Sequence, residues 1–347
     1  MEKIVKEVCG IDVAQGELVV ALGRMTGDLN ADVYAYKSFT NNQKGFELLL
    51  KWVKKLTVDY VNVCFVMEAT GVYHQKLAYF LCQNDQVVSI VLPNKISNYF
   101  RTLDVKTVTD KTASEAITLF GLSRKLDNWT PPDPLFRQIR QLVRERDQLI
   151  QARTVAKNQL HAEQAEMHPL RNTIARFKKQ IALLDKQIAE IVADINVLIK
   201  SDEKLKANIA LLASIRGIGL LTAATVLAET NGFDLIRNKR QLTSYAGLDV
   251  KEKQSGTSVK GKSKISKRGN KYLRKALHMP ALAAIKHDER FKGIFARLVS
   301  KHGIKMKAAV AVQRKLLEMM YTLYKKQEKY DSDYLKKQNQ PAATEVQ

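Results

Sequence analysis

The sequence lacks the cysteine and histidine patterns of disulfide-bonded or zinc-binding proteins. It has three cysteines, Cys9, Cys64 and Cys82, each within an apolar run and none in a Cys-x-x-Cys pair. Isolated cysteines of this kind are typical of small core residues in a reducing compartment. The six histidines are scattered without ligand spacing. We therefore expect neither disulfides nor structural zinc.

Long hydrophobic runs are lacking as well. No apolar stretch approaches the roughly 18 to 20 residues that a membrane-crossing helix needs. The first six residues, Met-Glu-Lys-Ile-Val-Lys, do not have the pattern of a signal peptide. We expect a cytoplasmic protein that has no membrane partner.

Acidic residues are scarce relative to basic ones. Lysine and arginine number 57 against 35 aspartates and glutamates, which gives a net charge of +22. So large an excess favours a polyanionic partner, because lysine and arginine neutralise phosphates and release counterions. The excess is unevenly placed along the chain, which favours nucleic acid as the partner over a generically basic soluble protein.

The first 130 residues follow an alternating α/β pattern, and the 347-residue chain is long enough for a second domain. Apolar or alternating runs predict strands at 8–13, 17–22, 33–39, 62–67 and 87–92, and helical periodicity predicts helices at 42–55, 73–82 and 93–103. Three strands followed by helix, strand, helix, strand and helix is the order of a ribonuclease H-like α/β domain. We assign residues 1–130 to this domain.

Residues 131–208 change to a long helical pattern. A weak apolar stripe from Ile139 to Leu160 is followed, after His168-Pro169, by a heptad pattern. The residues at its a and d positions are Phe177, Ile181, Leu184, Ile188, Ile191, Ile195, Leu198 and Leu205. We expect an antiparallel coiled-coil hairpin with arms on the order of 45 Å long. Such a hairpin can separate two active regions, join protomers or serve as a mere spacer.

Residues 209–330 predict a mainly helical domain. Ile215-Arg216-Gly217-Ile218-Gly219 precedes an apolar helix at 220–229, and a Gly-, Ser- and Lys-rich loop at 250–270 precedes helices at 272–286 and 305–325. The motif at 215–219 resembles a helix-hairpin-helix turn, whose glycines let backbone N–H groups approach a phosphate. A tight turn between helices needs the same glycines. Residues 331–347 predict a disordered tail.

Two predicted buried strands end in an acidic residue. The first ends in Gly-Ile-Asp12-Val and the fourth in Met-Glu68-Ala. An acid on each of two neighbouring strands can converge on divalent metal ions, which activate a hydroxyl group and stabilise the leaving oxygen in phosphodiester transfer. Mg²⁺ or Mn²⁺ suits an all-oxygen site. Strand-end carboxylates also serve as turn or capping residues, but two in this strand order favour a metal site.

More acids stand in the segment from 103 to 116. Asp110 directly precedes a predicted helix that runs to Leu126, where it is either a metal ligand or an N-terminal cap. Glu115 lies within that helix, and Asp104 comes before it. Each is a candidate for a further carboxylate of the site.

The strongest charge feature runs from Arg237 to Lys275 and holds 13 basic residues against two acidic ones. Ser255 lies within it, so a hydroxyl stands where a phosphate would be held and can attack phosphorus. On chemistry alone Thr257, Ser258, Ser263 and Ser266 are equal competitors, and Ser255 can also be an ordinary residue of a phosphate-contact loop. The residues expected to contact nucleic acid are Arg216, Gly217, Gly219, Lys260, Lys262, Lys264, Lys267, Arg268, Lys271 and Arg274.

Together, these motifs resemble the DEDD transposases of bacterial insertion sequences over almost the whole chain. In the N-terminal region the family's order is followed by Gly-Ile-Asp-Val at 10–13, Met-Glu-Ala-Thr-Gly at 67–71, Thr-Asp at 109–110 and Glu-Ala-Ile-Thr-Leu at 115–119. It continues with Ile-Arg-Gly-Ile-Gly at 215–219, Tyr-Ala-Gly-Leu at 245–248, Gln-Ser-Gly at 254–256 and Lys-Arg-Gly-Asn-Lys-Tyr-Leu-Arg at 267–274.

The resemblance implies DNA transposition by a RuvC-like N-terminal domain and a serine-containing transposase domain. Asp12, Glu68 and Asp110 would bind Mg²⁺ or Mn²⁺, and Ser255 would be the nucleophile. The resemblance also implies a homo-oligomer, a dimer or tetramer, in which the RuvC-like domain of one subunit completes a site with the serine of another. A structured RNA encoded by the element would choose the DNA by base pairing. No other cofactor is implied.

The third block departs from the family's pattern. The family usually has Thr-Asp-x-x-Asp-Ala, whereas here Thr109-Asp110 is followed by Lys-Thr-Ala-Ser and then Glu115-Ala116. The fourth carboxylate is therefore either Glu115 or Asp104. We favour Glu115, because Ala116 and Leu119 keep the family's spacing after it.

Other classes of protein share parts of this pattern. A RuvC-like junction resolvase or nuclease would use the same acids without Ser255. A sugar-kinase-like ATPase also begins with a Gly-Ile-Asp strand, but the sequence has no later Asp-x-Gly-Gly phosphate loop. A non-catalytic nucleic-acid-binding protein would tolerate Asp12→Asn and Glu68→Gln.

Overall fold

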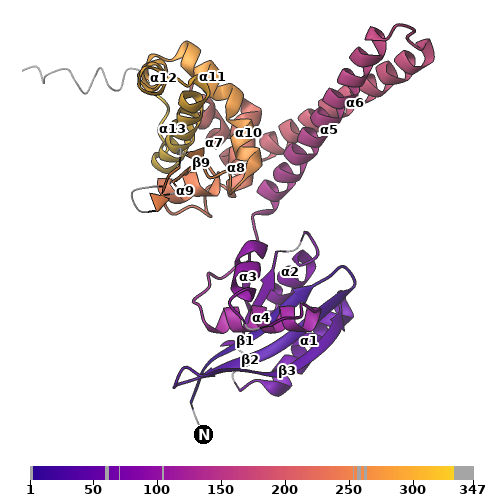
Figure 1. The fold of residues 1–347 in the computed structure, drawn as a ribbon, viewed down its shortest axis with the longest axis vertical. Helices are drawn as coiled ribbons and strands as arrows, with labels where there is room; N and C mark the ends of the chain where they lie inside the picture. Colours follow the sequence, from indigo (N-terminus) through magenta and orange to yellow (C-terminus); the bar gives the residue numbers. More distant parts are fainter. Residues whose placement is uncertain are drawn as a thin grey trace, which may run out of the picture. The chain divides into compact units, whose positions relative to one another are not determined.

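A five-stranded sheet in the order β3-β2-β1-β4-β5 forms the centre of the N-terminal unit in the computed structural model (Figure 1). The strands are β1 (Ile4–Val13), β2 (Glu17–Thr26), β3 (Ala31–Thr40), β4 (Cys64–Glu68) and β5 (Val87–Val91). β2 is antiparallel to β1 and β3, whereas β4 is parallel to β1 and β5. This mixed sheet confirms the predicted ribonuclease H-like N-terminal domain.

The structure describes residues 3–58, 62–69, 71–103, 105–252, 254–255, 259–261 and 264–331. The chain divides into two compact units, Met1–Pro131 and Pro132–Gln347. In the described part of the chain, no helix is both long and apolar enough to cross a membrane.

Helices cover both faces of the sheet. They are α1 (Gln43–Leu56), α2 (Gln75–Gln83), α3 (Pro93–Phe100) and α4 (Asp110–Leu122). One apolar core joins α1 and α2 to the side chains of Cys9, Ile11 and Met67 on the sheet. A second core joins α3 and α4 to Val8 and Val66. Alternate strand residues therefore face opposite cores, as the pleat of a strand requires.

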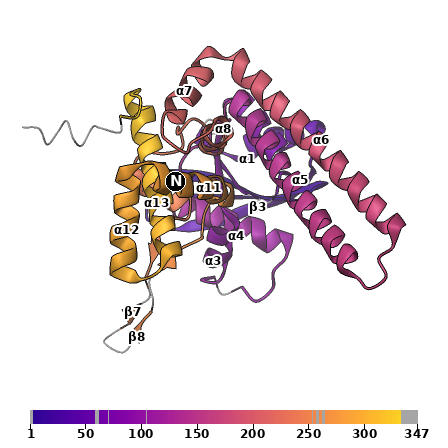
Figure 2. The ribbon, with the colours of Figure 1, turned by 90° about the horizontal axis from the view of Figure 1, so that it is seen from above.

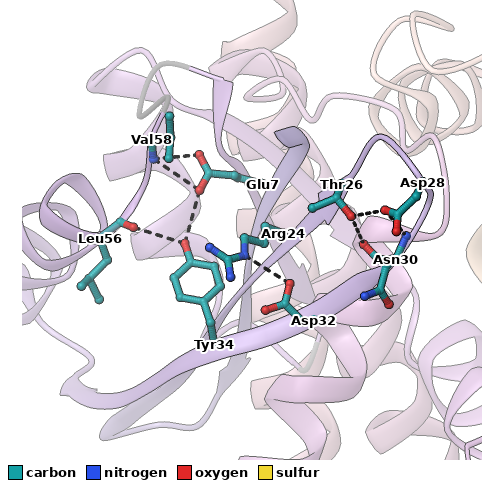
Figure 3. Close-up of polar contacts among 9 residues, drawn as sticks. All are labelled: Glu7, Arg24, Thr26, Asp28, Asn30, Asp32, Tyr34, Leu56 and Val58. Carbon is teal, nitrogen blue, oxygen red and sulfur yellow. Dashed lines mark hydrogen bonds and ion pairs between the residues drawn. The ribbon is translucent and has the colours of Figure 1, made fainter. Parts of the chain in front are cut away.

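Polar contacts secure the end of the sheet where β1 begins (Figure 3). The buried Glu7 carboxylate accepts hydrogen bonds from the Val58 backbone N–H after α1, at 3.1 Å, and from the Tyr34 hydroxyl, at 3.3 Å. Burial and the Glu7 charge raise the pKa of Tyr34. Arg24 donates to Asp32 at 3.3 Å between β2 and β3. These contacts are structural, and they lie at the opposite end of β1 from Asp12.

The second unit begins with a long antiparallel helical hairpin, α5 (Pro134–Ala165) and α6 (Arg171–Ser201), seen in Figures 1 and 2. Its root is embedded in the core of the C-terminal helices through Ile139, Ile191 and Ile195. α6 ends before the last predicted heptad position, because Asp202 caps the next helix and accepts a hydrogen bond from the Leu205 N–H at 2.6 Å. The coiled-coil geometry of this hairpin stays a prediction.

The C-terminal part of this unit is mainly helical. Its helices are α7 (Glu203–Ala213), α8 (Leu220–Thr230), α9 (Lys239–Tyr245), α10 (Lys271–Ala276), α11 (His278–His287), α12 (Glu289–His302) and α13 (Lys305–Lys326). The single helix predicted at 272–286 is two helices, and Pro280, which has no N–H to donate to the Ala276 carbonyl, accounts for the break. α12 was not among the helices predicted from the sequence; Asp288 caps it by accepting from the Arg290 N–H at 3.0 Å.

α4 lies directly on the sheet at Gly10. A Cβ atom at Gly10 would stand 2.2 Å from Thr118 Oγ1, 2.5 Å from the Thr118 backbone nitrogen and 2.8 Å from the Ser114 carbonyl oxygen. Thr118 is fully buried, and its hydroxyl is shared between the Ser114 carbonyl of its own helix, at 2.8 Å, and the Ala21 carbonyl of β2, at 3.1 Å. The helix therefore cannot keep this position if residue 10 has a side chain.

We expect Gly10→Ala to lower the free energy of unfolding by at least about 1–3 kcal/mol, since the added methyl group overpacks the contact with α4. Urea denaturation measures the change. Gly16→Ala is the control, because no described atom lies within 4 Å of a Cβ at that position. Equal stability of the two variants would show that α4 does not depend on the contact at Gly10.

Candidate carboxylate site and serine hairpin

Asp12 and Glu68 lie beside each other at the carboxyl ends of two parallel strands. In the register of β1 and β4, Ile11 pairs with Met67, so the next residues on the two strands are Asp12 and Glu68. Ile11 and Met67 are buried in the core under α1 and α2. Because successive side chains alternate, Asp12 and Glu68 belong to the opposite face, which α4 covers.

Asp110 is the first residue of α4, and the residue before it caps the helix. The Thr109 hydroxyl accepts from the Thr112 N–H at 3.2 Å, and the Thr112 hydroxyl accepts from the Thr109 N–H at 2.8 Å. The N-cap of α4 is therefore Thr109 rather than Asp110. A carboxylate in the first turn is favoured by the partial positive charge of the helix N-terminus.

The Asp12, Asp110 and Glu68 carboxylates are close enough to interact electrostatically. Burial raises the pKa of Asp12, and the negative charges of Asp110 and Glu68 raise it further, while a hydrogen bond from the Val13 backbone lowers it in part. Like charges gathered at a strand end are costly, and a bound cation would relieve the cost. An acid whose pKa is perturbed by burial and by neighbouring charges, as Asp12 is, is typical of functional sites.

The donor chemistry of this cluster fits a hard divalent cation, since all its ligands would be oxygens. The side chains are not yet gathered as ligands: among the described residues, no three Asp, Glu, His or Cys side chains stand together closely enough to hold an ion. A metal ion would therefore have to draw the carboxylates of Asp12, Glu68 and Asp110 together.

Glu115 is not brought to the other acids. It lies five residues after Asp110, about 140° around the helix at 3.6 residues per turn. Its carboxylate pairs instead with Lys111 Nζ at 3.9 Å, and this Nζ stands 5.4 Å from the centre of the Tyr36 ring on β3. Asp104, the other candidate, lies outside the described residues. The identity of the fourth carboxylate stays a prediction.

Asn41 supports the carboxylate site but was not predicted from the sequence. Its side-chain amide donates to the Ala14 carbonyl at 2.8 Å and to the Tyr73 carbonyl at 3.3 Å. These carbonyls follow Asp12 by two residues and Glu68 by five, so Asn41 ties together the segments that leave the two acidic strands. The neighbouring Asn42 has a different role: it caps α1 by accepting from the Gly45 N–H at 2.9 Å.

Ser255 lies in a β-hairpin that we call the serine hairpin, residues 250–265. β6 (Val250–Lys251) pairs with β9 (Lys264–Ile265), and β7 (Gln254–Ser255) pairs with β8 (Val259–Lys260). In this register Ser255 stands opposite Val259. β7 and β8 project away from the C-terminal helices (Figure 2). Thr257, Ser258, Lys262, Ser263 and the side chains of Ser255 and Lys260 lie outside the described residues.

The two feet of the serine hairpin, residues 245–249 and 266–270, are joined by backbone hydrogen bonds. The Asn270 N–H donates to the Tyr245 carbonyl at 2.7 Å, and the Lys267 N–H donates to the Gly247 carbonyl at 3.1 Å. A Cβ atom at Gly269 would stand 2.5 Å from both the Gly247 nitrogen and the Tyr245 oxygen, so a glycine is needed there.

Two of the residues expected to contact nucleic acid, and one competitor of Ser255, have structural partners. Arg274 Nη1 donates to the Ala246 carbonyl at 2.8 Å and so binds the first foot. Arg216 Nη1 donates to the His287 carbonyl at 2.9 Å. The Ser266 hydroxyl donates to the Asp249 carboxylate at 2.5 Å, which explains this serine by structure alone.

The other expected contact residues that the structure describes remain accessible. Lys264, Lys267, Arg268 and Lys271 are exposed at or beside the feet. Gly217 has a φ of +92°, and a Cβ there would stand 2.8 Å from the Pro280 carbonyl oxygen, so the turn itself requires this glycine. Gly219 begins α8 and is exposed, with no described atom within 4 Å of a Cβ. The N-terminus of α8 is therefore open to a phosphate.

Two family models match the chain. Residues 9–169 match the DEDD_Tnp_IS110 model, described as "Transposase", and residues 209–296 match the model described as "Transposase IS116/IS110/IS902 family".

Relatives match over most or part of the chain. The pilin gene-inverting protein of Moraxella lacunata is 28% identical over 94% of this chain and 98% of the relative. That of Moraxella bovis is 30% identical over 85% of this chain and 90% of the relative. The transposase for insertion sequence element IS1111A of Coxiella burnetii is 30% identical over 41% of this chain and 39% of the relative.

One similar solved structure is T. thermophilus RuvC in complex with Holliday junction substrate. The match spans 35% of this chain and 99% of the RuvC chain, with 10% sequence identity and a TM-score of 0.28. This likeness is too weak to bear on activity.

These matches, found for a chain with a ribonuclease H-like sheet and strand-end carboxylates, define a DNA transposase or recombinase. The chain belongs to the DEDD transposase family of IS110-type insertion sequences, as the sequence motifs predicted. Membership of this family implies a divalent metal and DNA as a partner.

We expect Asp12→Asn to raise the thermal midpoint of the metal-free protein at neutral pH. Because folding raises the pKa of Asp12, its charged form destabilises the fold above that pKa. The gain should shrink as the pH falls through the raised pKa and vanish below the ordinary aspartate pKa of about 3.9, where the carboxyl group is protonated in both states. Asp32→Asn, which removes the ion pair with Arg24, is the control and should give no gain. A lower midpoint for Asp12→Asn at neutral pH would contradict the repulsion.

Proposed function

We propose that this transposase cleaves and rejoins DNA with a divalent metal bound by Asp12, Glu68 and Asp110, and with Ser255 as the nucleophile. The observation that carries the proposal is the nearness of the three acids, two at strand ends and one at the start of α4, where burial raises the pKa of Asp12 and the charges of Asp110 and Glu68 raise it further. When bound at such a site, a divalent ion stabilises negative charge on the phosphoryl and leaving oxygens.

Ser255 would attack the phosphorus of a DNA phosphodiester through its hydroxyl oxygen. A new oxygen–phosphorus bond forms, the bond to one deoxyribose oxygen breaks, and the serine proton passes to a base or to the leaving oxygen. The phosphoserine link keeps the phosphodiester energy, so a deoxyribose hydroxyl of another strand can attack it and release Ser255. Support comes from the family's serine block and from the basic segment around the hairpin.

The protein around these groups would hold DNA by its backbone. Lys264, Lys267 and Arg268 at the hairpin feet and the open N-terminus of α8 at Gly219 suit phosphate contacts rather than base recognition. We propose that Glu115 is the fourth carboxylate and would have to turn from Lys111 to reach the site.

The choice of DNA sites would be made by a structured RNA encoded by the element. The net charge of +22 suits an additional polyanion beside DNA, and in such RNA-guided systems base pairing carries the sequence specificity. We also propose a dimer or tetramer in which residues 1–130 of one subunit act with the serine of residues 209–330 of another. The helical hairpin, within 131–208, would connect the two.

A second candidate function is inversion of a DNA segment between two sites. It is favoured by relatives named pilin gene-inverting proteins, which match 94% and 85% of this chain. Inversion and transposition need the same cleavage and rejoining, so the same residues would serve both. A single DNA molecule that carries two sites in opposite orientation distinguishes the two functions, because inversion would yield the same molecule with the segment between the sites reversed.

We expect the full-length protein, with Mg²⁺, the element's flanking RNA and paired DNA sites, to form a covalent protein–DNA adduct that maps to Ser255. Ser255→Ala should abolish the adduct and strand exchange, because the attacking oxygen is lost. Denaturing gels and peptide mass spectrometry of the digested adduct measure both. Ser258→Ala, at a neighbouring serine of the same loop, is the matched control.

Normal strand exchange by Ser255→Ala would overturn the serine assignment. Cleavage without any adduct would favour the alternative of a RuvC-like junction resolvase or nuclease. Strand exchange without the flanking RNA would overturn RNA guidance while leaving the two sets of reacting groups in place.

A further inference from the structure

Glu229, near the end of α8, is a fully buried carboxylate whose two oxygens are both bonded. Arg144 of α5 donates from Nε to Oε1 and from Nη2 to Oε2, both at 2.7 Å. Asn270 Nδ2 donates to Oε2 at 2.6 Å. A two-pronged arginine–carboxylate pair is strong and directional. Because buried ion pairs often add no net stability over apolar residues of the same volume, this one calls for a role beyond stability.

The partners of Glu229 include both feet of the serine hairpin. On the second foot, Asn270 bonds the carboxylate and also caps α10, since its Oδ1 accepts from the Tyr272 N–H at 2.9 Å. On the first foot, the Tyr245 hydroxyl donates to the Glu229 backbone carbonyl at 2.8 Å. Asn270 and Tyr245 are joined to each other by a backbone hydrogen bond of 2.7 Å. The start and the end of the hairpin therefore meet at one residue.

The other side of the network is the root of the helical hairpin. Arg144 lies on α5, and its guanidinium carbon stands 4.7 Å from the centre of the Tyr272 ring at the start of α10. About one turn further along α5, Asp147 pairs with Lys275 of α10. These two contacts hold α10, and with it the second foot, against α5.

We propose that Glu229 is a positioning residue for strand exchange, which holds the serine hairpin in one orientation relative to the root of the α5–α6 hairpin. The proposal rests on the proposed role of Ser255. When Glu229 is neutralised, the β6–β9 and β7–β8 ladders can still form and Asp147 still pairs with Lys275, but the feet lose the charged bond that joins them to Arg144. Ser255 would then spend less time aligned with the phosphorus, and a misplacement of about 1 Å can cost on the order of 100-fold in rate.

The test compares Glu229→Gln with Glu318→Gln in the full-length protein. Glu318 on α13 is a matched control, because it is also largely buried and bonded by two cations, Arg314 at 2.9 Å and Lys315 at 2.8 Å. Both cations belong to α13 itself rather than to the feet. Amide hydrogen exchange, measured by mass spectrometry, reports the anchoring of the feet. The rate of Ser255–DNA adduct formation reports alignment.

For Glu229→Gln we expect adduct formation to slow by on the order of 100-fold at unchanged DNA affinity. Amides of residues 245–249 and 266–270 should exchange faster, while those of α12 and α13 keep the wild-type rate. Glu318→Gln should change neither the adduct rate nor exchange at the feet. Tyr245→Phe removes the hydroxyl that bonds the Glu229 carbonyl and the Asn270 side chain, and serves as a second variant that keeps the Arg144–Glu229 charge pair. Its feet should also exchange faster.

Unchanged exchange at the feet in both Glu229→Gln and Tyr245→Phe would overturn the proposal. An equal rise in exchange over the whole C-terminal unit would also overturn it, since that marks a general loss of stability. If Ser255 is not the nucleophile, no adduct forms in any variant, but exchange at the feet still reports whether Glu229 anchors them. The two proposals therefore fail in different measurements.

Discussion

The carboxylate site depends on the close approach of α4 to β1 at Gly10. The helix can approach because residue 10 has no side chain, and the buried Thr118 hydroxyl then bonds the sheet at Ala21. On the helix side Gly121 fits against Val8, where a Cβ would stand 2.7 Å from a Val8 methyl carbon. With α4 fixed in this way, its first residue, Asp110, lies near the edge of the sheet at which β1 and β4 end in Asp12 and Glu68.

This packing gathers like charges that the metal-free protein tolerates only at a cost. Burial together with Asp110 and Glu68 raises the pKa of Asp12, and Asp110 itself stands in the first turn of α4, where a negative charge is favoured. The serine hairpin is positioned in another way, by hydrogen bonds at its feet and by the buried Glu229 carboxylate. In both places the proposed reacting groups belong to segments that are fixed by contacts at their base, and precise alignment requires such support.

Much of the N-terminal unit could be predicted from sequence because its signals are local. Alternation and apolar runs predicted the strands, and Asp12 and Glu68 stood at predicted strand ends. The start of α4 followed from Thr109-Asp110, although the cap is Thr109. The direction of Glu115 could not be predicted, because it depends on how α4 is rolled against Gly10 and Thr118.

Contacts between distant segments left no local pattern to recognise. Arg144 and Glu229 are 85 residues apart, and Asn41 acts through the carbonyls of Ala14 and Tyr73 rather than through a motif. Such contacts arise from packing between elements, which a single sequence does not state. α12, by contrast, was missed although its signals are local: Asp288 can cap it, and Phe291, Ile294, Phe295, Leu298 and Val299 follow helical spacing.

The most direct test of the carboxylate site is the binding of Mn²⁺ to the full-length protein, followed by electron paramagnetic resonance. We predict that Asp110→Asn weakens Mn²⁺ binding by at least about 10-fold, because it removes one of the three carboxylates that would bind the ion. Asn41→Ala, which leaves all acids in place, should weaken it less. Undiminished Mn²⁺ binding by Asp110→Asn would contradict the claim that α4 brings a metal ligand to Asp12 and Glu68.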